Sequence, residues 1–236
     1  MTSFPRYAIY FVPAADSDIT RFGAATLGYD AFSGHLLPFA DGLTATFADW
    51  HDLTRDPRKY GFHGTLKAPF SLTSGVDEAD LVTACAEFCT SAREIPLITP
   101  VVRGIGDFIA IVPEQPSPAL NRLAQDCVEV FDRFRAPLTA ADRARRNPER
   151  LTPRQVAQLD RWGYPYVLDD FRFHMTLSGR IPVERREAVL TMLRERFAAL
   201  DQSALAIDRI AVFRQGDAQS SFRIISHYEL RPRPAL

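Results

Sequence analysis

The chain has 236 residues, of which 46% are hydrophobic and 24% are charged. This composition is typical of globular proteins and excludes disordered, collagenous and coiled-coil chains. The 28 Lys and Arg residues nearly balance the 29 Asp and Glu residues, which leaves a net charge of −1. Because proteins that neutralise many phosphates usually carry a basic surplus, this balance disfavours a long nucleic acid as partner.

The three cysteines, Cys85, Cys89 and Cys127, are too few for a secreted disulfide framework, and we interpret them as buried thiols. Pro13 interrupts the N-terminal apolar stretch 7–15, which favours a first strand over a signal sequence. No apolar run approaches the ~18 residues that a membrane span needs. We therefore expect a cytoplasmic protein that does not act in a membrane.

Hydrophobic periodicity predicts strands and helices mixed along the chain. In chain order, strands are expected at 6–12, 61–67, 97–104, 107–113, 171–178, 204–213 and 221–230. Helices are expected at 17–27, after Asp77, after the capping residue Ser117, at 152–162 and around 189–200. Segment 34–58 is ambiguous, and 136–149 is polar and rich in arginine. Without regular βαβ alternation, the α+β class with antiparallel sheets is favoured.

One five-residue motif occurs twice. Phe62-His63-Gly64-Thr65-Leu66 recurs as Phe173-His174-Met175-Thr176-Leu177. After each copy, the predicted order is an amphipathic helix followed by two strands, which indicates a duplicated unit. Although a His-x-Thr alone is a weak signal, the matching Phe and Leu flanks and the recurring elements make chance a poor explanation.

Side chains alternate between the two faces of a strand, so each His shares a face with the Thr two residues later. Lys67 continues the row in the first copy, and Arg172 and Ser178 continue it in the second. If the two units pack about a pseudo-twofold axis, two imidazoles and two hydroxyls meet in one cleft, with Lys67 and Arg172 at its edges. One neutral imidazole can then accept a proton from water while a protonated one donates to a leaving oxygen.

The two His-x-Thr motifs resemble those of the 2H phosphoesterase superfamily. The segments RYAIYF, YGFHGTLKAPF and RWGYPYVLDDFRFHMTLSGR are similar to a bacterial branch associated with phosphonate metabolism, and the likeness covers nearly the whole chain. This resemblance implies one bilobal domain over residues 1–236, with lobes that are not contiguous in sequence. Two antiparallel sheets, flanked by helices, would face each other across a central cleft.

The resemblance also implies metal-independent hydrolysis of a small cyclic phosphate ester, with a ribosyl cyclic phosphate as the expected substrate and no cofactor. Carried over by motif, His63 and His174 correspond to the catalytic histidines, and Thr65 and Thr176 to the phosphate-binding hydroxyls. Which histidine is acid and which is base stays open, because the motif is symmetric. Secondary candidates for substrate contacts are Lys67, Arg172, Tyr10 and Tyr164.

Two other functions are weighed against this one. The first is a 2′,3′-cyclic phosphodiesterase that acts on RNA ends or nucleotides, which the near-neutral charge disfavours. The second is a non-catalytic module that binds a sugar phosphate or nucleotide.

The arginine series from Arg143 to Arg161 is interpreted as a solvated face. The alternative is that it faces the cleft and holds a second, terminal phosphate of the substrate.

Overall fold

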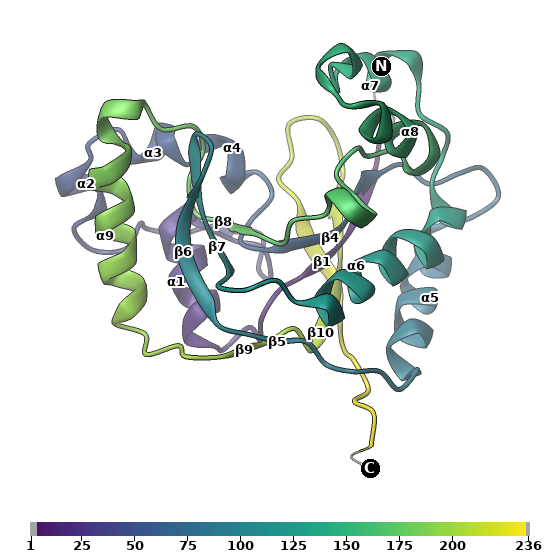
Figure 1. Ribbon diagram of the computed structural model, residues 1–236, viewed down its shortest axis with the longest axis horizontal. Helices are drawn as coiled ribbons and strands as arrows, with labels where there is room; N and C mark the ends of the chain where they lie inside the picture. The colour runs from purple at the N-terminus through teal and green to yellow at the C-terminus, as the bar shows by residue number, and fades with distance from the viewer. Residues whose placement is uncertain (1–3, 235–236) are drawn as a thin grey trace.

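The computed structural model describes residues 4–234 and confirms the α+β class, with strands and helices mixed along the chain (Figure 1). The strands are β1 Arg6–Phe11, β2 Tyr29–Asp30, β3 His35–Leu36, β4 Gly64–Phe70, β5 Leu97–Ile98, β6 Pro100–Ile105, β7 Phe108–Pro113, β8 Met175–Thr176, β9 Leu205–Ala206, β10 Arg209–Gln215 and β11 Arg223–Glu229. The α-helices are α1 Asp18–Leu27, α2 Leu43–Thr46, α3 Trp50–Leu53, α4 Arg55–Arg58, α5 Glu78–Thr90, α6 Pro118–Val130, α7 Ala140–Ala144, α8 Pro153–Trp162 and α9 Arg186–Ala198. Short 3₁₀ turns lie at η1 Phe131–Phe134, η2 Pro148–Arg150, η3 Leu168–Asp170 and η4 Val183–Arg185.

The principal helices begin where the sequence places capping residues. The side chains of Ser17, Asp77, Ser117 and Thr152 each accept a hydrogen bond from a backbone N–H in the first turn of α1, α5, α6 and α8. These contacts satisfy donors that a helix N-terminus otherwise leaves free. The ambiguous segment 34–58 forms β3 and the short helices α2–α4. None of the helices within residues 4–234 combines the length and apolar character needed to cross a membrane.

A seven-stranded antiparallel sheet in the order β11-β10-β1-β4-β8-β7-β6 forms the centre of the molecule. The two expected sheets are therefore halves of one sheet. They meet where β4 pairs with β8 through a single residue pair, Gly64 and Met175. The expected strand 171–178 has regular pairing only at its middle, which makes β8 a two-residue bridge between the halves.

The duplicated units exchange elements across this junction. The hairpin β6–β7, which follows the first motif, pairs with β8, whereas β10, from the unit of the second motif, pairs with β1. The helices cross over in the same way, because α5 packs on β10 and β11 and α9 packs on β6. Strands β5 and β9, at matching places in the two units, pair directly with each other. Each half of the sheet thus contains elements of both copies, which supports the pseudo-twofold duplication.

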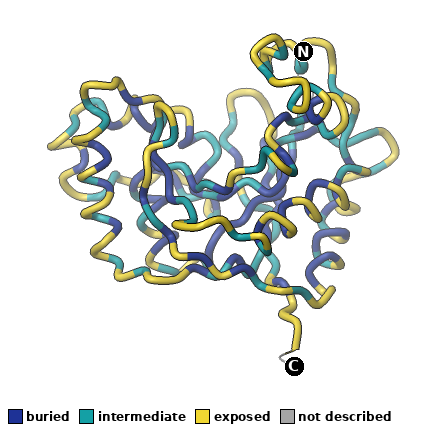
Figure 2. Tube along the Cα trace, viewed as in Figure 1, coloured by how far each residue is buried: buried dark blue, intermediate teal, exposed yellow. Residues whose placement is uncertain are grey.

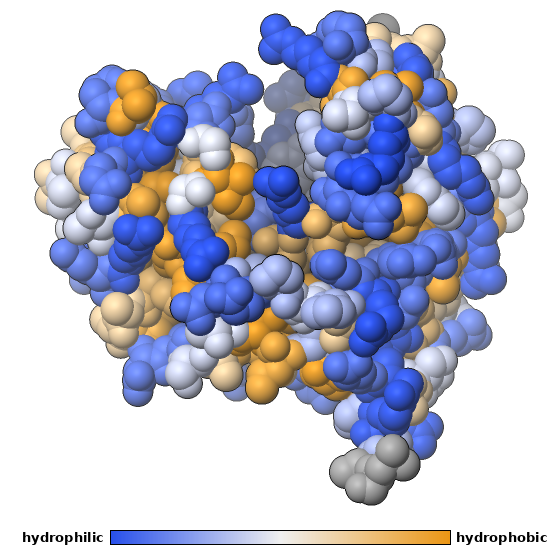
Figure 3. All heavy atoms as spheres, viewed as in Figure 1, coloured by the Kyte–Doolittle hydropathy of each residue, from blue (hydrophilic) through white to orange (hydrophobic). Residues whose placement is uncertain are grey.

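The two faces of β1 show how the sheet separates its two environments. Tyr7, Ile9 and Phe11 lie in the large helix-covered core, while Ala8, Tyr10 and Val12 join a smaller cluster on the opposite face. Both sets are nearly inaccessible to solvent, and dark blue, buried trace runs through the centre of the molecule in Figure 2. The outer surface has a hollow between two regions of the molecule (Figure 3). One region contains α2, α3 and α9, and the other contains α7 and α8.

The phenylalanines that precede the two histidines each pack against a glycine. A Cβ atom on Gly64 would lie 2.4 Å from Cε2 of Phe173, and one on Gly23 in α1 would lie 2.1 Å from Cγ of Phe62. Both distances are shorter than any real Cβ contact. The ring of the second motif therefore occupies the space that only a glycine in the first motif leaves open, at the junction of β4 with β8.

We expect Gly64→Ala to destabilise the protein by about 1–3 kcal/mol, because the added methyl group overpacks the contact with Phe173. The free energy of unfolding in denaturant measures this change. Gly104→Ala in β6 is the matched control, since a Cβ there meets nothing within 4 Å, and its effect should stay within about 0.5 kcal/mol. Equal effects of the two variants would contradict the packing role of Gly64.

Candidate functional site

The two motif histidines are anchored in the same way. Nδ1 of His63 donates a hydrogen bond to the carbonyl oxygen of Gly61 at 2.9 Å, and Nδ1 of His174 donates to the carbonyl oxygen of Arg172 at 2.8 Å. A carbonyl oxygen can only accept, so each neutral ring carries its proton on Nδ1 and leaves Nε2 as an acceptor. The backbone two residues before each histidine thus fixes the tautomer on both sides.

The histidines and threonines occupy the face of the sheet opposite the large core. Leu66, Phe173, Met175 and Leu177, which alternate with them, all lie in that core. Gly64 and Met175 are direct partners across the junction, so the four motif side chains project from adjacent positions of β4 and β8. The structure therefore brings the two motifs together as the sequence predicts.

The two imidazoles differ in what meets Nε2. Nε2 of His63 lies 3.2 Å from Oγ1 of Thr65, which can donate to it. Within residues 4–234, Nε2 of His174 has no hydrogen-bond partner, and its ring packs near Phe108 at a centroid distance of 5.6 Å. The two imidazoles are also close enough to interact electrostatically. A positive charge on His174 lowers the pKa of His63.

Aromatic rings enclose His63. The ring of Tyr10 is stacked on the imidazole at a centroid distance of 3.8 Å, with Phe213 at 5.9 Å and Tyr60 at 6.3 Å. This burial lowers the pKa of His63 to about 4, against the opposing effect of the Gly61 hydrogen bond. Burial also lowers the pKa of His174. Tyr10 therefore lines the site, and burial raises the pKa of its hydroxyl, which stays protonated.

Lys67 does not lie in the site, so the expectation that it continues the row of His63 and Thr65 is wrong. The pairing of β1 with β4 shifts register between Tyr10–Thr65 and Ile9–Lys67, and this bulge turns Lys67 onto the helix-covered face. There its side chain is 3% exposed, and its ammonium donates to the carbonyl oxygen of Val128 at 2.9 Å and to Asp132 at 3.1 Å. Lys67 is a structural cation at the C-terminal end of α6.

Ser178 is also structural, although strand alternation places it in the row of His174. It is fully buried, and its hydroxyl accepts from the backbone N–H of Ile109 and donates to the carbonyl oxygen of Gly179. Arg172 is exposed, and its backbone carbonyl holds Nδ1 of His174. Among residues 4–234 its guanidinium has no hydrogen bond or ion pair, and its contact with a substrate stays a prediction.

Tyr164 lies at the boundary between the histidine site and the arginine segment. Its ring lies under the guanidinium of Arg146, at 5.0 Å from the centroid. The hydroxyl of Tyr164 lies close enough to two other tyrosines for electrostatic effects on pKa. Negative charge on Tyr60 raises the pKa of Tyr164, and negative charge on Tyr164 raises the pKa of Tyr10. The side chain is half-buried and close to Tyr60, one of the rings around His63, and its contact with a substrate stays a prediction.

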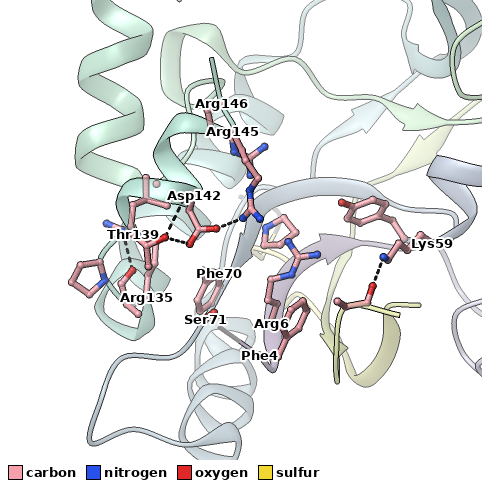
Figure 4. Close-up of a pocket in the computed structure, with 17 residues that line it drawn as sticks. Phe4, Arg6, Lys59, Phe70, Ser71, Arg135, Thr139, Asp142, Arg145 and Arg146 are labelled. Carbon is pink, nitrogen blue, oxygen red and sulfur yellow. Dashed lines mark hydrogen bonds and ion pairs between the residues drawn. The ribbon is translucent and has the colours of Figure 1, made fainter. Parts of the chain in front are cut away.

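Sequence reasoning missed a cavity of about 760 Å³ that opens beside these tyrosines. Its lining includes five cationic side chains and one carboxylate: Arg6, Lys59, Arg135, Arg145, Arg146 and Asp142 (Figure 4). These residues come from β1, the segment before β4, the segment after η1, and α7 with the turn that follows it. No local motif joins them, and only the arginine-rich composition of 136–149 gave a signal.

Most of the arginine series is paired rather than free. Arg143 forms an ion pair with Asp160, Arg154 with Asp170, and Arg161 with Asp132. The interpretation as a solvated face therefore holds for these three residues. Arg145 and Arg146 instead line the cavity. Within residues 4–234, no group of three or more His, Cys, Asp or Glu side chains is arranged to hold a metal ion.

We expect the imidazole of His63 to titrate near pH 4 in the free protein and to carry its proton on Nδ1 when neutral. The physical cause is burial against aromatic rings, which disfavours the imidazolium. Two-dimensional ¹H–¹⁵N NMR across a pH titration measures both properties, with the signal assigned by its loss in His63→Ala. A pKa at or above 6.5, or a proton on Nε2, would contradict this geometry.

We expect Asp132→Ala to destabilise the protein by about 3–5 kcal/mol, because it leaves the buried ammonium of Lys67 without its carboxylate partner. Glu94→Ala is the control, since its ion pair with Arg122 is exposed on both sides, and should cost about 1 kcal/mol or less. Chemical denaturation of both variants tests this. An effect of Asp132→Ala no larger than that of Glu94→Ala would refute the buried pair.

Comparison with known proteins gives one family model, two curated proteins similar in sequence and several solved structures. Residues 65–223 match the model of a family described as "Protein of unknown function (DUF1045)". Two solved structures align over 97% of this chain and 99% of theirs at 12% identity: a crystal structure of a phosphoesterase, with a TM-score of 0.43, and E. coli LigT complexed with ATP, with a TM-score of 0.42.

Two curated relatives both carry the name ribose 1,5-bisphosphate phosphokinase PhnN. The one from Janthinobacterium sp. (strain Marseille) is 37% identical over 219 residues, covering 90% of this chain and 48% of that protein. The one from Laribacter hongkongensis is 29% identical over 225 residues, covering 93% of this chain and 50% of that protein. The chain spans about half the length of these relatives. Because the family model covers well over half of the chain and includes Thr65, His174 and Thr176, this protein belongs to the DUF1045 family.

Proposed function

We propose that this chain is a metal-independent phosphoesterase that hydrolyses a cyclic phosphodiester on a ribose-type sugar. The observation that carries the proposal is the mirrored anchoring of His63 and His174 on adjacent strands. Each imidazole is held through Nδ1 and presents Nε2 on the face that also bears Thr65 and Thr176. Two such groups can serve opposite ends of one in-line displacement at phosphorus.

The reaction requires that the attacking water loses a proton and that the leaving ring oxygen gains one. A water molecule attacks phosphorus as Nε2 of the basic imidazole takes its proton, and a bond forms between phosphorus and the water oxygen. The bond from phosphorus to one ring oxygen breaks as the other imidazole, protonated on Nε2, donates to that oxygen. The product is a phosphomonoester beside a free hydroxyl group, and each histidine ends in the protonation state in which the other began.

The environments favour His63 as the base. A base must be neutral before reaction, and the enclosed His63, with its pKa lowered to about 4, is neutral near pH 7. His174 has an Nε2 without a partner among residues 4–234, so it is free to contact a leaving oxygen. An anionic phosphate beside it favours the imidazolium form that an acid requires.

The threonines supply hydrogen bonds to the non-bridging phosphate oxygens. Thr65 and Thr176 each lie two residues after a histidine and share its face of the sheet. Their hydroxyls can donate to these oxygens as negative charge develops there in the transition state. Because β4 and β8 fix both side chains, this contribution needs little reorganisation during the reaction.

The names of the curated relatives support a ribose phosphate as the substrate class. A ribose 1,5-bisphosphate phosphokinase consumes ribose 1,5-bisphosphate, and this chain matches about half of two proteins with that name. Opening of a 5-phosphoribosyl 1,2-cyclic phosphate at the bond between phosphorus and O2 leaves the phosphate on C1 and yields that compound. Under this proposal the chain supplies the kinase with its substrate, which places it in phosphonate metabolism.

We expect His63→Ala and His174→Ala each to lower kcat/KM by about 10²- to 10⁴-fold, the usual contribution of general acid–base catalysis. Because the base must be neutral and the acid protonated, kcat/KM should rise as the pH increases through about 4, where His63 loses its proton. At higher pH it should fall again as His174 loses its proton, and because burial lowers the pKa of His174, this decrease should be centred at a pH lower than 6.5. Residual activity of His63→Ala should lack the acidic limb, and that of His174→Ala the alkaline limb. The opposite pattern would reverse the assignment of acid and base.

Thr65→Ala and Thr176→Ala should each lower kcat by about 10²- to 10³-fold, as loss of a donor to a developing oxyanion does. Thr65→Ser and Thr176→Ser keep the hydroxyl and serve as matched controls that retain most of the rate. If the serine variants lose as much as the alanine variants, the hydroxyls do not contribute through hydrogen bonds to the phosphate.

The proposal is tested by turnover in excess EDTA, with His63→Ala/His174→Ala as the blank. The substrates are 5-phosphoribosyl 1,2-cyclic phosphate and a nucleoside 2′,3′-cyclic phosphate, and ³¹P NMR identifies the products. The expected result is conversion of the first to ribose 1,5-bisphosphate. Turnover of only the second would assign the chain to RNA ends or nucleotides. Turnover of neither, or turnover abolished by EDTA, would overturn the proposal.

A further inference from the structure

The cavity beside the histidine site has a charge pattern that the chain as a whole lacks. The protein has a net charge of −1, yet five cationic side chains and one carboxylate line this space. Arg145 is paired with Asp142, and Arg135 with Asp132. Arg6, Lys59 and Arg146 form no ion pair with a carboxylate among residues 4–234. A concentration of unneutralised cations in a concave site is what an anionic ligand needs.

These three cations are held in place by neutral groups. Nε of Arg6 donates to Oε1 of Gln215 at 2.8 Å, and Nζ of Lys59 donates to the carbonyl oxygen of Ala218 at 2.6 Å. Arg146 lies over the ring of Tyr164. Such contacts orient a charged head without cancelling its charge, and they leave further N–H donors free on each side chain. The cations are therefore prepared for hydrogen bonds to phosphate oxygens.

The cavity is connected to the histidine site through tyrosines. Tyr60 lines the cavity, and its ring centroid lies 6.3 Å from that of His63. Tyr10, which is stacked on His63, is close enough to Arg6 and Arg146 for both charges to act on its hydroxyl. A small sugar that lies across Tyr60 would place its two ends in the two sites.

We propose that Arg6, Lys59 and Arg146 bind a second, terminal phosphomonoester group of the same substrate, while its cyclic phosphate lies between His63 and His174. This inference rests on the proposed function and adds to it the residues that select such a substrate: the cavity cations would bind the dianionic phosphate at one end of the sugar while the histidines act on the cyclic phosphate at the other end. The three cations favour a dianionic phosphate, because hydrogen bonds between oppositely charged groups are stronger than those between neutral groups.

The test compares a ribosyl 1,2-cyclic phosphate with and without the 5-phosphate. The wild-type protein should show a higher kcat/KM for the phosphorylated compound, by about 10- to 100-fold if one or two charged hydrogen bonds are made. Arg146→Ala should reduce this ratio about tenfold, and Arg146→Lys should restore part of it. Arg150→Ala, an exposed arginine outside the cavity lining, should leave the ratio unchanged.

A wild-type ratio near one, or a ratio that Arg146→Ala does not alter, would overturn the inference while leaving the proposed hydrolysis intact. If neither compound is hydrolysed, the proposed function fails, and binding then decides the inference separately. In that case calorimetry with ribose 5-phosphate as the probe should show binding to the wild type that Arg146→Ala weakens and Arg150→Ala does not. Absence of binding, or equal binding to all three proteins, would overturn it.

Discussion

The contact between Gly64 and the ring of Phe173 determines how closely the two halves of the molecule approach. β4 and β8 are joined by one residue pair, and the motif phenylalanine occupies the volume that a side chain at position 64 would take. Because His63 and His174 are the immediate neighbours of these two residues, the same packing sets the separation of the imidazoles. Stability and the geometry of the site depend on one close contact at the junction.

The site combines a weakly polar environment with fixed hydrogen-bond partners. Tyr10 and Phe213 surround His63, and burial drives its pKa down to about 4. The carbonyl groups of Gly61 and Arg172 hold both rings in the tautomer that presents Nε2. In such surroundings interactions with a phosphate are stronger than in water, because less solvent competes for the same donors. The cationic side chains of Arg6, Lys59 and Arg146 line the neighbouring cavity and not the space around His63.

The amino-acid sequence predicts the parts of this architecture that follow from local repetition. The doubled Phe-His-x-Thr-Leu motif, with its recurring helix and strands, correctly places His63 and His174 on one face of the sheet, together with Thr65 and Thr176. Strand alternation then fails at Lys67, because a bulge between β1 and β4 turns that residue to the other face. A bulge depends on pairing with a distant strand, and no pattern in residues 61–67 indicates it.

The cationic cavity could not be predicted for a related reason. Arg6 belongs to β1, Lys59 precedes β4, and Arg146 follows α7, so their proximity is a property of the tertiary fold. Composition alone marked the arginine-rich segment, but it did not distinguish Arg143, which is paired with Asp160, from Arg146, which is not paired with a carboxylate among residues 4–234. Such a distinction requires the positions of the acidic partners, which lie at irregular distances along the chain.

The most direct test of the central claim, that both imidazoles act on one phosphorus atom, is a crystal structure of the protein with bound orthovanadate. This anion adopts the five-coordinate geometry of an in-line displacement at phosphorus. We expect Nε2 of His63 and Nε2 of His174 to lie within hydrogen-bond distance of opposite apical oxygens, with the hydroxyls of Thr65 and Thr176 on the equatorial ones. Vanadate held by only one histidine, or bound only among the cations of the neighbouring cavity, would contradict the claim.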